Sequence, residues 1–426
     1  MQLKEERIKN VVLGAGIAGL AFASEISEGN TVVFEKEKYY GGLCRSFDVD
    51  GYSFDTAVHL SFTKIPEARA YFDRTPCLTH KPLSYNYYHS YWLKHPLIFN
   101  MAPLPTRDKV DFLQSFVEER YSGEINNYED WLMASYGKSI TEKIYNVYTK
   151  KYWTVDAKDL STDWIGGRIN VPDFRKMLNG AFETETGNDY YASEMRYPKE
   201  GRYQTFLQPL AENADIRCEK EAVRVDTYNK EVYFSDGNIV KYENLTSSIP
   251  IPELIRIMDN VPSEITGLSA KLKASKISIV SVGFNRPDIP RWLWFYIYDQ
   301  DILAARVNSP SMKSPANAPS GCSSLQFEIY HGQGEKIDKG GILDNVKYSL
   351  IKMNLCSEED IKFMDYRLVP YGNVIFFEGM EEVRDRVKKY LEDKDITLIG
   401  RFGEWDYLWS DQSYMSGIYA ARKGAK

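Results

Sequence analysis

A glycine-rich hexapeptide near the N-terminus constrains this chain more than any other feature. Residues 14–19 read Gly-Ala-Gly-Ile-Ala-Gly. An apolar run at 8–13 precedes them, apolar residues at helical spacing continue over 17–28, and a second β-branched run follows at 31–34. The order of strand, glycine turn, helix and strand predicts a βαβ unit of the Rossmann-like kind.

Each glycine of the hexapeptide has its own physical role. Gly14 allows a tight turn, Gly16 lets the backbone approach a pyrophosphate, and Gly19 lets the helix pack closely on the strand. The phosphates would meet the helix N-terminus. Glu35 ends the second strand, where a carboxylate can accept hydrogen bonds from ribose hydroxyls. We therefore predict a dinucleotide site, in which Ala18 and Lys36 also contact the cofactor.

Composition sets limits on the class of protein. With 43% hydrophobic and 27% charged residues, the chain is expected to be globular, and its 426 residues suggest two or three domains. The net charge of -7 and the absence of a basic stripe argue against nucleic acid as a partner. Since no apolar run is long enough for a bilayer and residues 1–7 lack a leader's apolar core, we expect a cytoplasmic protein without a membrane span. A homo-oligomer is one of the partner arrangements that this composition allows.

The five cysteines do not suggest a metal or redox centre. Their number is odd, they are scattered, and no C-x-x-C pair occurs among them. We expect reduced thiols and no metal site. Cys44 lies in a second glycine-rich segment, where a small buried side chain is the favoured reading and a redox thiol the alternative.

That second segment separates the possible dinucleotides. Gly41 and Gly42 precede Arg45, and a Gly-Tyr-Ser-Phe-Asp stretch at 51–55 leads to His59. Close-packed backbone N–H groups and a guanidinium suit a phosphate. Here the sequence resembles the superfamily of flavin amine oxidases, protoporphyrinogen oxidases and phytoene desaturases. The resemblance implies FAD as the cofactor, with His59 over the flavin, although a histidine satisfied by backbone groups is an alternative.

Later segments extend this resemblance over most of the chain. The strand at 221–225 is similar to one whose backbone, at about Val223, contacts the adenine. The helical stretch 136–168, which ends at Arg168, looks like the substrate domain of bacterial protoporphyrinogen-oxidase-like proteins. Near the C-terminus, Gly400, Arg401 and Ser416 complete the implied cofactor contacts.

The segment 400–411 is similar to a narrower group, the UDP-galactopyranose mutases. This resemblance implies that Arg401 lies near the flavin and that Tyr407 reaches a substrate diphosphate. Arg306 resembles an arginine after the mutases' aromatic wall strand, which binds the diphosphate there. The alternative is that Arg306 forms an ion pair with a neighbouring acid such as Asp301.

The predicted fold class is α/β, with a discontinuous Rossmann-like FAD-binding domain and an interleaved α+β substrate domain. The FAD domain comprises 1–70, 197–260 and 365–426, and the substrate domain comprises 71–196 and 261–364. The elements expected beyond the βαβ unit are helices at 107–120, 128–153 and from 413, strands at 222–225, 231–234, 277–284, 292–298 and 396–400, and a loop at 309–320.

The function predicted first is that of an FAD-dependent oxidoreductase acting on an unidentified small substrate, with a sugar nucleotide among the candidates. His59, Arg306 and Tyr407 are the predicted reaction-site residues. One alternative is a redox-neutral mutase of a nucleotide sugar, in which Arg306 and Tyr407 would stabilise the diphosphate. The other is a non-catalytic flavin-binding partner protein.

Overall fold

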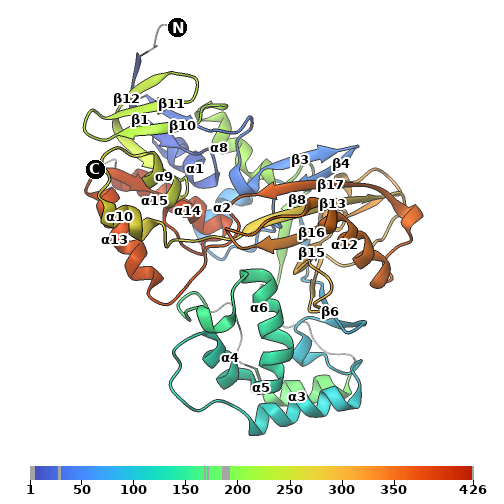
Figure 1. Ribbon diagram of the computed structural model, residues 1–426. Coiled ribbons are helices and arrows are strands. Elements are labelled where there is room, and N and C mark those ends of the chain that lie inside the picture. The colour runs from blue at the N-terminus through green and yellow to red at the C-terminus, as the bar shows by residue number, and fades with distance from the viewer. Residues whose placement is uncertain (1–4, 27–29, 167–168, 170–171, 185–191, 425–426) are drawn as a thin grey trace.

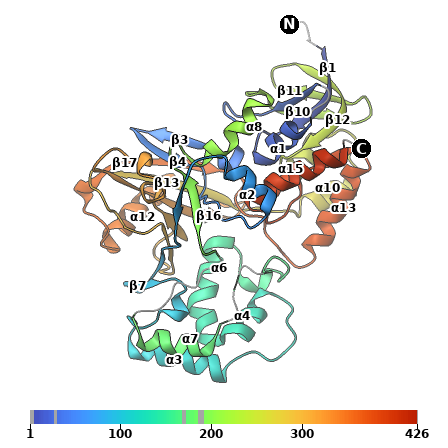
Figure 2. The ribbon, with the colours of Figure 1, turned by 180° about the vertical axis from the view of Figure 1, so that it is seen from behind.

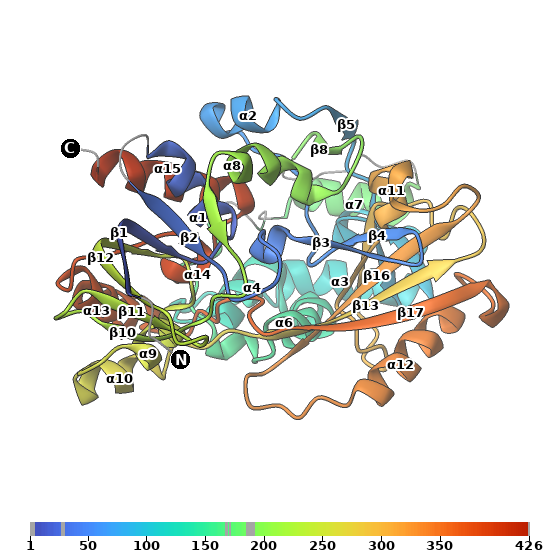
Figure 3. The same ribbon diagram turned by 90° about the horizontal axis from the view of Figure 1, so that it is seen from above.

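The computed structural model describes residues 5–26, 30–166, 169, 172–184 and 192–424. It contains two large sheets, and a group of helices lies below them in Figure 1. The first sheet draws its strands from both ends of the chain, and helices cover it on two faces (Figure 3). The predicted α/β class with a Rossmann-like domain is therefore confirmed.

The first sheet contains the predicted βαβ unit. Strand β1 (Glu5–Leu13) pairs in parallel with β2 (Thr31–Phe34) on one side and with β12 (Ile239–Ser247) on the other. Helix α1 (Ile17–Glu25) connects β1 to β2. A β10–β11 hairpin extends one edge in antiparallel fashion. In spatial order the strands are β10 (Ala222–Asp226), β11 (Glu231–Phe234), β12 (Ile239–Ser247), β1 (Glu5–Leu13), β2 (Thr31–Phe34) and β9 (Asp215–Arg217), with β18 (Ile396–Leu398) also paired to β12.

Helices from opposite ends of the sequence pack together on the first sheet. The N-terminal helix α1 (Ile17–Glu25) lies against the C-terminal helix α15 (Ser410–Gly424). Their backbones approach so closely that a Cβ on Gly417 would lie 2.2 Å from the carbonyl oxygen of Ala18. The opposite face is covered by α9 (Ile251–Ile257), α10 (Ser263–Ser269) and α13 (Met380–Glu392).

The second sheet is mostly antiparallel, and its central strands are buried on both faces. Alternate residues of a strand point to opposite faces. Phe327 and Ile329 accordingly pack with Val346 of α12 (Lys339–Lys352), while Glu328 and Tyr330 face the other way. The strand order is β17 (Ile361–Val369), β13 (Lys276–Phe284), β16 (Ser323–His331), β15 (Arg306–Asn308), β14 (Trp294–Ile297), β6 (Ser84–Tyr88) and β7 (Tyr91–Lys94).

In the helical unit below the sheets, one predicted helix is divided into shorter pieces (Figure 2). A continuous helix was expected over 128–153, but Gly137 interrupts it with a φ of 78°. The observed pieces are α4 (Tyr128–Tyr136), α5 (Lys138–Ile140), a π-helical turn (Thr141–Tyr145) and α6 (Asn146–Trp153). They pack with α3 (Thr106–Glu118) and α7 (Phe174–Phe182).

The remaining elements are short. The predicted loop at 309–320 is wrong in part, because α11 (Pro310–Lys313) and a 3-10 turn (Pro315–Asn317) form there, each with a proline in its first turn. The others are α2 (Pro66–Phe72), α8 (Gln208–Glu212), α14 (Gly400–Gly403), the small ladders β3 (Ser46–Val49) with β4 (Tyr52–Asp55) and β5 (Cys77–His80) with β8 (Met195–Pro198), and 3-10 turns at Gly42–Cys44, Leu97–Phe99, Ala157–Asp159, Tyr203–Leu207 and Glu358–Asp360.

The predicted domain division and the predicted absence of a membrane span can both be compared with these elements. The domain boundary expected at residue 365 falls inside β17, and the division into two domains stays a prediction. Within the described residues, none of the helices combines the length and the apolar character that crossing a bilayer requires.

Candidate functional site

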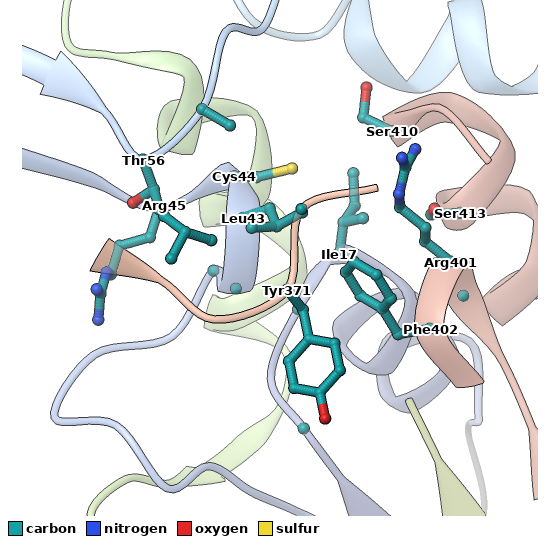
Figure 4. A pocket seen from close by; sticks show the side chains of 18 of the residues that line it. Ile17, Leu43, Cys44, Arg45, Thr56, Tyr371, Arg401, Phe402, Ser410 and Ser413 are labelled. Atoms are coloured by element: carbon teal, nitrogen blue, oxygen red, sulfur yellow. The ribbon is translucent and has the colours of Figure 1, made fainter. Parts of the chain in front are cut away.

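A cavity of about 710 Å³ lies between the two sheets. Its walls are built from the glycine turn after β1, the end of β2, residues 41–45 and 56–62, parts of the segments 248–257, 368–373 and 400–413, and the cavity-facing residues of β14, β15 and β16. Figure 4 shows part of this lining, with Ile17, Leu43, Tyr371, Arg401 and Phe402 around one space. Both sheets and the C-terminal segment therefore contribute to a single site.

The glycine turn has the geometry that its sequence predicts. Gly14 has a φ of 96°, and a Cβ on Gly19 would lie 2.1 Å from the Gly14 carbonyl oxygen. Gly19 therefore serves helix packing, and it is not among the residues that line the cavity. A Cβ on Gly16, at the N-cap of α1, would meet no protein atom within 4 Å. The free space beside Gly16 opens directly at the helix N-terminus.

The second glycine pair packs onto the first. Gly41 N–H donates to the Ala15 carbonyl oxygen at 2.8 Å, and a Cβ on Gly42 would lie 3.2 Å from the Gly16 Cα. Both glycines have positive φ, 120° and 55°, which side chains rarely tolerate. Two glycine turns far apart in sequence thus form one backbone-lined surface, and Arg45 stands at its rim, 3.9 Å from Glu37.

Glu35 lies at the same end of the cavity, with Lys36 beside it. Its carboxylate is buried and accepts hydrogen bonds from the backbone N–H groups of Ala15 at 2.9 Å and Glu37 at 3.0 Å. Glu35 therefore ties the end of β2 to the first glycine turn. Its contact with a ribose stays a prediction.

At the other end, α14 begins at Gly400, which has a φ of 73° and whose Cβ would meet that of Ala18 at 2.7 Å. Arg401 donates to the Leu408 carbonyl oxygen at 2.9 Å and to Asn373 Oδ1 at 3.0 Å, while its Nε is buried without a hydrogen-bond partner in the described structure. Ser416 does not border the cavity. Its hydroxyl instead accepts from the Gly400 N–H at 2.8 Å.

Three further residues from the sequence analysis are Val223, Arg168 and Cys44. Val223 is 45% exposed and outside the cavity wall, whereas the adjacent Glu221 and Ala222 line it. Arg168 lies outside the described residues. Cys44 is a buried part of the lining, and burial raises the pKa of its thiol to about 12, which fits a small apolar side chain better than a reactive thiolate.

His59 borders the cavity and also contacts a backbone carbonyl group, and its position over a flavin stays a prediction. It lines the cavity and stacks on Tyr203 with ring centroids 4.8 Å apart, while its Nδ1 lies 3.0 Å from the Ala57 carbonyl oxygen. Burial lowers its pKa to about 4, against the opposing effect of Asp55. The ring is thus neutral at physiological pH.

Arg306 does form an ion pair, but with a different acid from the one expected. Asp301 bonds to Lys352 and Tyr348 instead. Strand register places Arg306 opposite Glu328, and its Nε and Nη2 both lie 2.7 Å from Glu328 Oε2. Burial opposes the charge of Arg306, but Glu328 holds its pKa well above the ordinary value. The arginine is therefore a fixed cation in the cavity wall.

Tyrosines complete the wall around Arg306. The hydroxyls of Tyr152 and Tyr407 lie 3.1 Å apart, and the guanidinium groups of Arg306 and Arg401 lie over their rings at 5.8 Å and 4.6 Å, respectively. Tyr330 donates to Glu328 at 2.9 Å. All three predicted reaction-site residues, His59, Arg306 and Tyr407, thus line one cavity.

Sequence reasoning missed several residues of this wall. Glu328 could have been placed with Tyr330 on one face of its strand by alternation, but its pairing with Arg306 depends on strand register. Tyr371 and Asn373 lie in the connecting segment after β17, which carries no motif. The described residues hold no group of three or more His, Cys, Asp or Glu side chains arranged to bind a metal.

Comparisons with known proteins agree with this geometry. Residues 12–75 match the family model for an NAD(P)-binding Rossmann-like domain. An uncharacterised protein of the nifH2 3' region of Methanothermococcus thermolithotrophicus is 48% identical over 54 residues, which is 12% of this chain and 52% of that protein. The chain thus spans about half of that relative's length.

Solved structures extend the likeness to nearly the whole chain. The crystal structure of reduced UDP-galactopyranose mutase is 23% identical with a TM-score of 0.92, over 98% of this chain and 94% of that one. Putrescine oxidase bound to putrescine is 12% identical with a TM-score of 0.67, over 99% and 100%. A CLA-producing fatty acid isomerase from P. acnes is 11% identical with a TM-score of 0.65, over 98% of each chain.

At such identities the likeness shows a shared fold only. The three solved structures with this fold are a mutase, an oxidase and an isomerase. The expected cofactor, FAD, agrees with that fold and with the two glycine turns. Residues 12–75 of this chain thus match a Rossmann-like domain model, and the chain as a whole has the fold of UDP-galactopyranose mutase and putrescine oxidase.

Proposed function

We propose that the chain binds FAD in this cavity and acts as a redox-neutral mutase of a nucleoside diphosphate sugar. Support for the cofactor comes from the open space beside Gly16, at the N-terminus of α1 and against the Gly41–Gly42 turn. Backbone N–H groups and a helix N-terminus suit a pyrophosphate. When bound, the flavin would supply the electron pair that activates the sugar carbon.

The observation that carries the substrate proposal is Arg306. Its guanidinium lies in the wall of the cavity. Two of its nitrogens, Nε and Nη2, are held by Glu328 Oε2 at 2.7 Å. A rigid planar cation among tyrosine hydroxyls is suited to binding a diphosphate. The TM-score of 0.92 to UDP-galactopyranose mutase, over 98% of the chain, supports the same substrate class.

In this proposal the residues of the chain act on the leaving group. The bond between the anomeric carbon and the diphosphate oxygen would break, and its electron pair would stay with the oxygen. While the diphosphate is free, the anomeric carbon would exchange its bond to the ring oxygen for a bond to another hydroxyl oxygen of the sugar, with the proton passing from the second oxygen to the first. The bond between the anomeric carbon and the diphosphate would then form again. Arg306 and the hydroxyls of Tyr152 and Tyr407 would stabilise the negative charge on the free diphosphate. His59 is neutral and stacks on Tyr203, so the part of the cavity wall that it forms would carry no charge.

The test compares oxidised and dithionite-reduced protein incubated anaerobically with UDP-galactopyranose, with the products separated by chromatography. We expect a furanose isomer only from the reduced protein, and a change in the flavin spectrum on titration with UDP or dTDP. If neither nucleotide perturbs the spectrum, the sugar-nucleotide proposal is wrong. Bleaching of the oxidised flavin by a substrate would identify an oxidoreductase instead.

A further inference from the structure

A hydrogen bond joins two distant segments at the edge of the cofactor cavity. The hydroxyl of Tyr371 donates to Glu253 Oε1 at 2.7 Å, and both residues line the cavity. Glu253 belongs to α9, which comes directly after β12 of the first sheet. Tyr371 comes directly after β17 of the second sheet. The bond therefore ties together the two sides between which the cavity lies.

The Glu253 side of this contact is anchored to the glycine turn. Helix α9 begins just after β12, and Ser248 in that connection donates its hydroxyl hydrogen to the carbonyl oxygens of Leu13 and Gly14, each 3.1 Å away. Glu253 stands in the first turn of α9 and also accepts from Arg256 at 2.9 Å. Its position is thus fixed relative to the proposed pyrophosphate site.

The Tyr371 side is anchored to the second sheet and to α14. Gly372 N–H donates to the Ser275 carbonyl oxygen at 2.7 Å, and Asn373 Oδ1 accepts from Arg401 at 3.0 Å. The Tyr371 ring packs against Phe402 at 5.6 Å between centroids. Figure 4 shows Tyr371 projecting from the segment after β17, beside Phe402 and Ile17.

The protonation of the pair favours a strong bond. Burial and the neighbouring Glu253 raise the pKa of Tyr371, so its hydroxyl keeps its proton. Burial opposes the ionisation of Glu253, but hydrogen bonds from Tyr371 and Arg256 outweigh it and lower the pKa of the carboxyl. A neutral donor therefore meets a charged acceptor at neutral pH.

We propose that Tyr371 and Glu253 form a tie across the cofactor cavity that holds its two walls together and slows the release of the bound dinucleotide. The tie deepens the proposed function, since it rests on FAD binding in this cavity. Both residues are positioning residues: they act on the cofactor through the walls that they join.

The experiment measures the release rate of FAD from the full-length holoprotein by the rise of flavin fluorescence after dilution. Tyr371→Phe keeps the ring packing and removes the hydroxyl, and Glu253→Gln keeps the shape and removes the charge. Each should release FAD about tenfold faster or more, the factor expected for one hydrogen bond to a charged group. The double variant should be no faster than the faster single variant.

A matched control exists on the surface of the first sheet. Tyr233 donates to Glu231 at 2.6 Å, so Tyr233→Phe removes the same kind of bond away from the cavity and should release FAD at the wild-type rate. Equal thermal midpoints of the cofactor-free variants would separate the tie from a loss of fold. Wild-type release rates in Tyr371→Phe and Glu253→Gln, or additive effects in the double variant, would overturn the tie. A wild-type protein that does not retain FAD would overturn the proposed function itself.

Discussion

Gly16 shows how one hydrogen atom in place of a side chain can serve a ligand and not the fold. The space beside its Cα is open, whereas Gly14 and Gly19 are required by the protein's own backbone. The three glycines of one motif thus divide into two that shape the turn and one that leaves room. Substitutions at these positions should separate the two roles.

We expect Gly16→Ala to fold normally and to lose FAD. The added methyl group meets no protein atom, so the thermal midpoint of the cofactor-free protein should stay unchanged, while the space for a pyrophosphate is reduced. FAD affinity should fall roughly tenfold or more, which corresponds to ~1.4 kcal/mol. Absorbance of the reconstituted protein measures it. The control is Gly267→Ala in α10, whose Cβ also meets no atom and which lies outside the cavity wall.

Arg306 couples binding to stability through Glu328. Arg306→Ala leaves that buried carboxylate without its cation, which should cost about 3 kcal/mol of unfolding free energy. Arg306→Lys should restore part of the stability but only a small part of UDP binding, because an ammonium lacks the planar fork. Urea unfolding and UDP titration measure the two effects. Full UDP affinity in the lysine variant would refute a bidentate role for the arginine.

At the scale of elements, strand register decides what the cavity contains. The strands β14, β15 and β16 place Tyr296, Arg306 and Glu328 on the same face, opposite α12. Alternation along one strand is readable from sequence, but the partner across the ladder is not. The Arg306–Glu328 pair therefore could not be predicted from the sequence.

The break in the long helical segment is also an effect at this scale. Gly137 has a φ of 78°, and its Cβ would lie 2.3 Å from the Ser115 carbonyl oxygen of α3. Gly137→Ala should therefore destabilise the protein by about 1–3 kcal/mol, measured by urea unfolding. Gly267→Ala, in a regular helix with free space, should be neutral or slightly stabilising. A neutral Gly137→Ala would show that the helix can continue.

The whole molecule should lose stability in mild acid. Burial lowers the pKa values of His59 and His95 to about 4, below the ordinary value of 6.5. Between about pH 4 and 6.5 the unfolded chain then binds more protons than the folded one, so stability is complete above that range and falls as the pH decreases through it. Thermal midpoints measured from pH 7.5 to 4.5 check this. The decline should be shallower in His59→Asn, and an unchanged decline would contradict the contribution of His59.

The local sequence by itself determined the Rossmann-like βαβ unit of this protein and the glycine pair that packs on it. The turn at 14–19, the strand ends and the glycine pair at Gly41 and Gly42 are short-range patterns, whose backbone needs are met within a few residues. The domain limits, by contrast, stay a prediction. The sheet was assembled from segments as distant as β1 and β18, which periodicity cannot order.

Only the tertiary structure decided what faces the cofactor cavity. Arg306 is held by Glu328, and Tyr152 meets Tyr407, because residues far apart in sequence were brought to one face by packing and strand pairing. Likewise, Val223 and Ser416 fall just outside the cavity wall, although their motifs resemble cofactor contacts. A local pattern fixes backbone conformation, whereas the orientation of a side chain toward a ligand depends on contacts that local sequence does not encode.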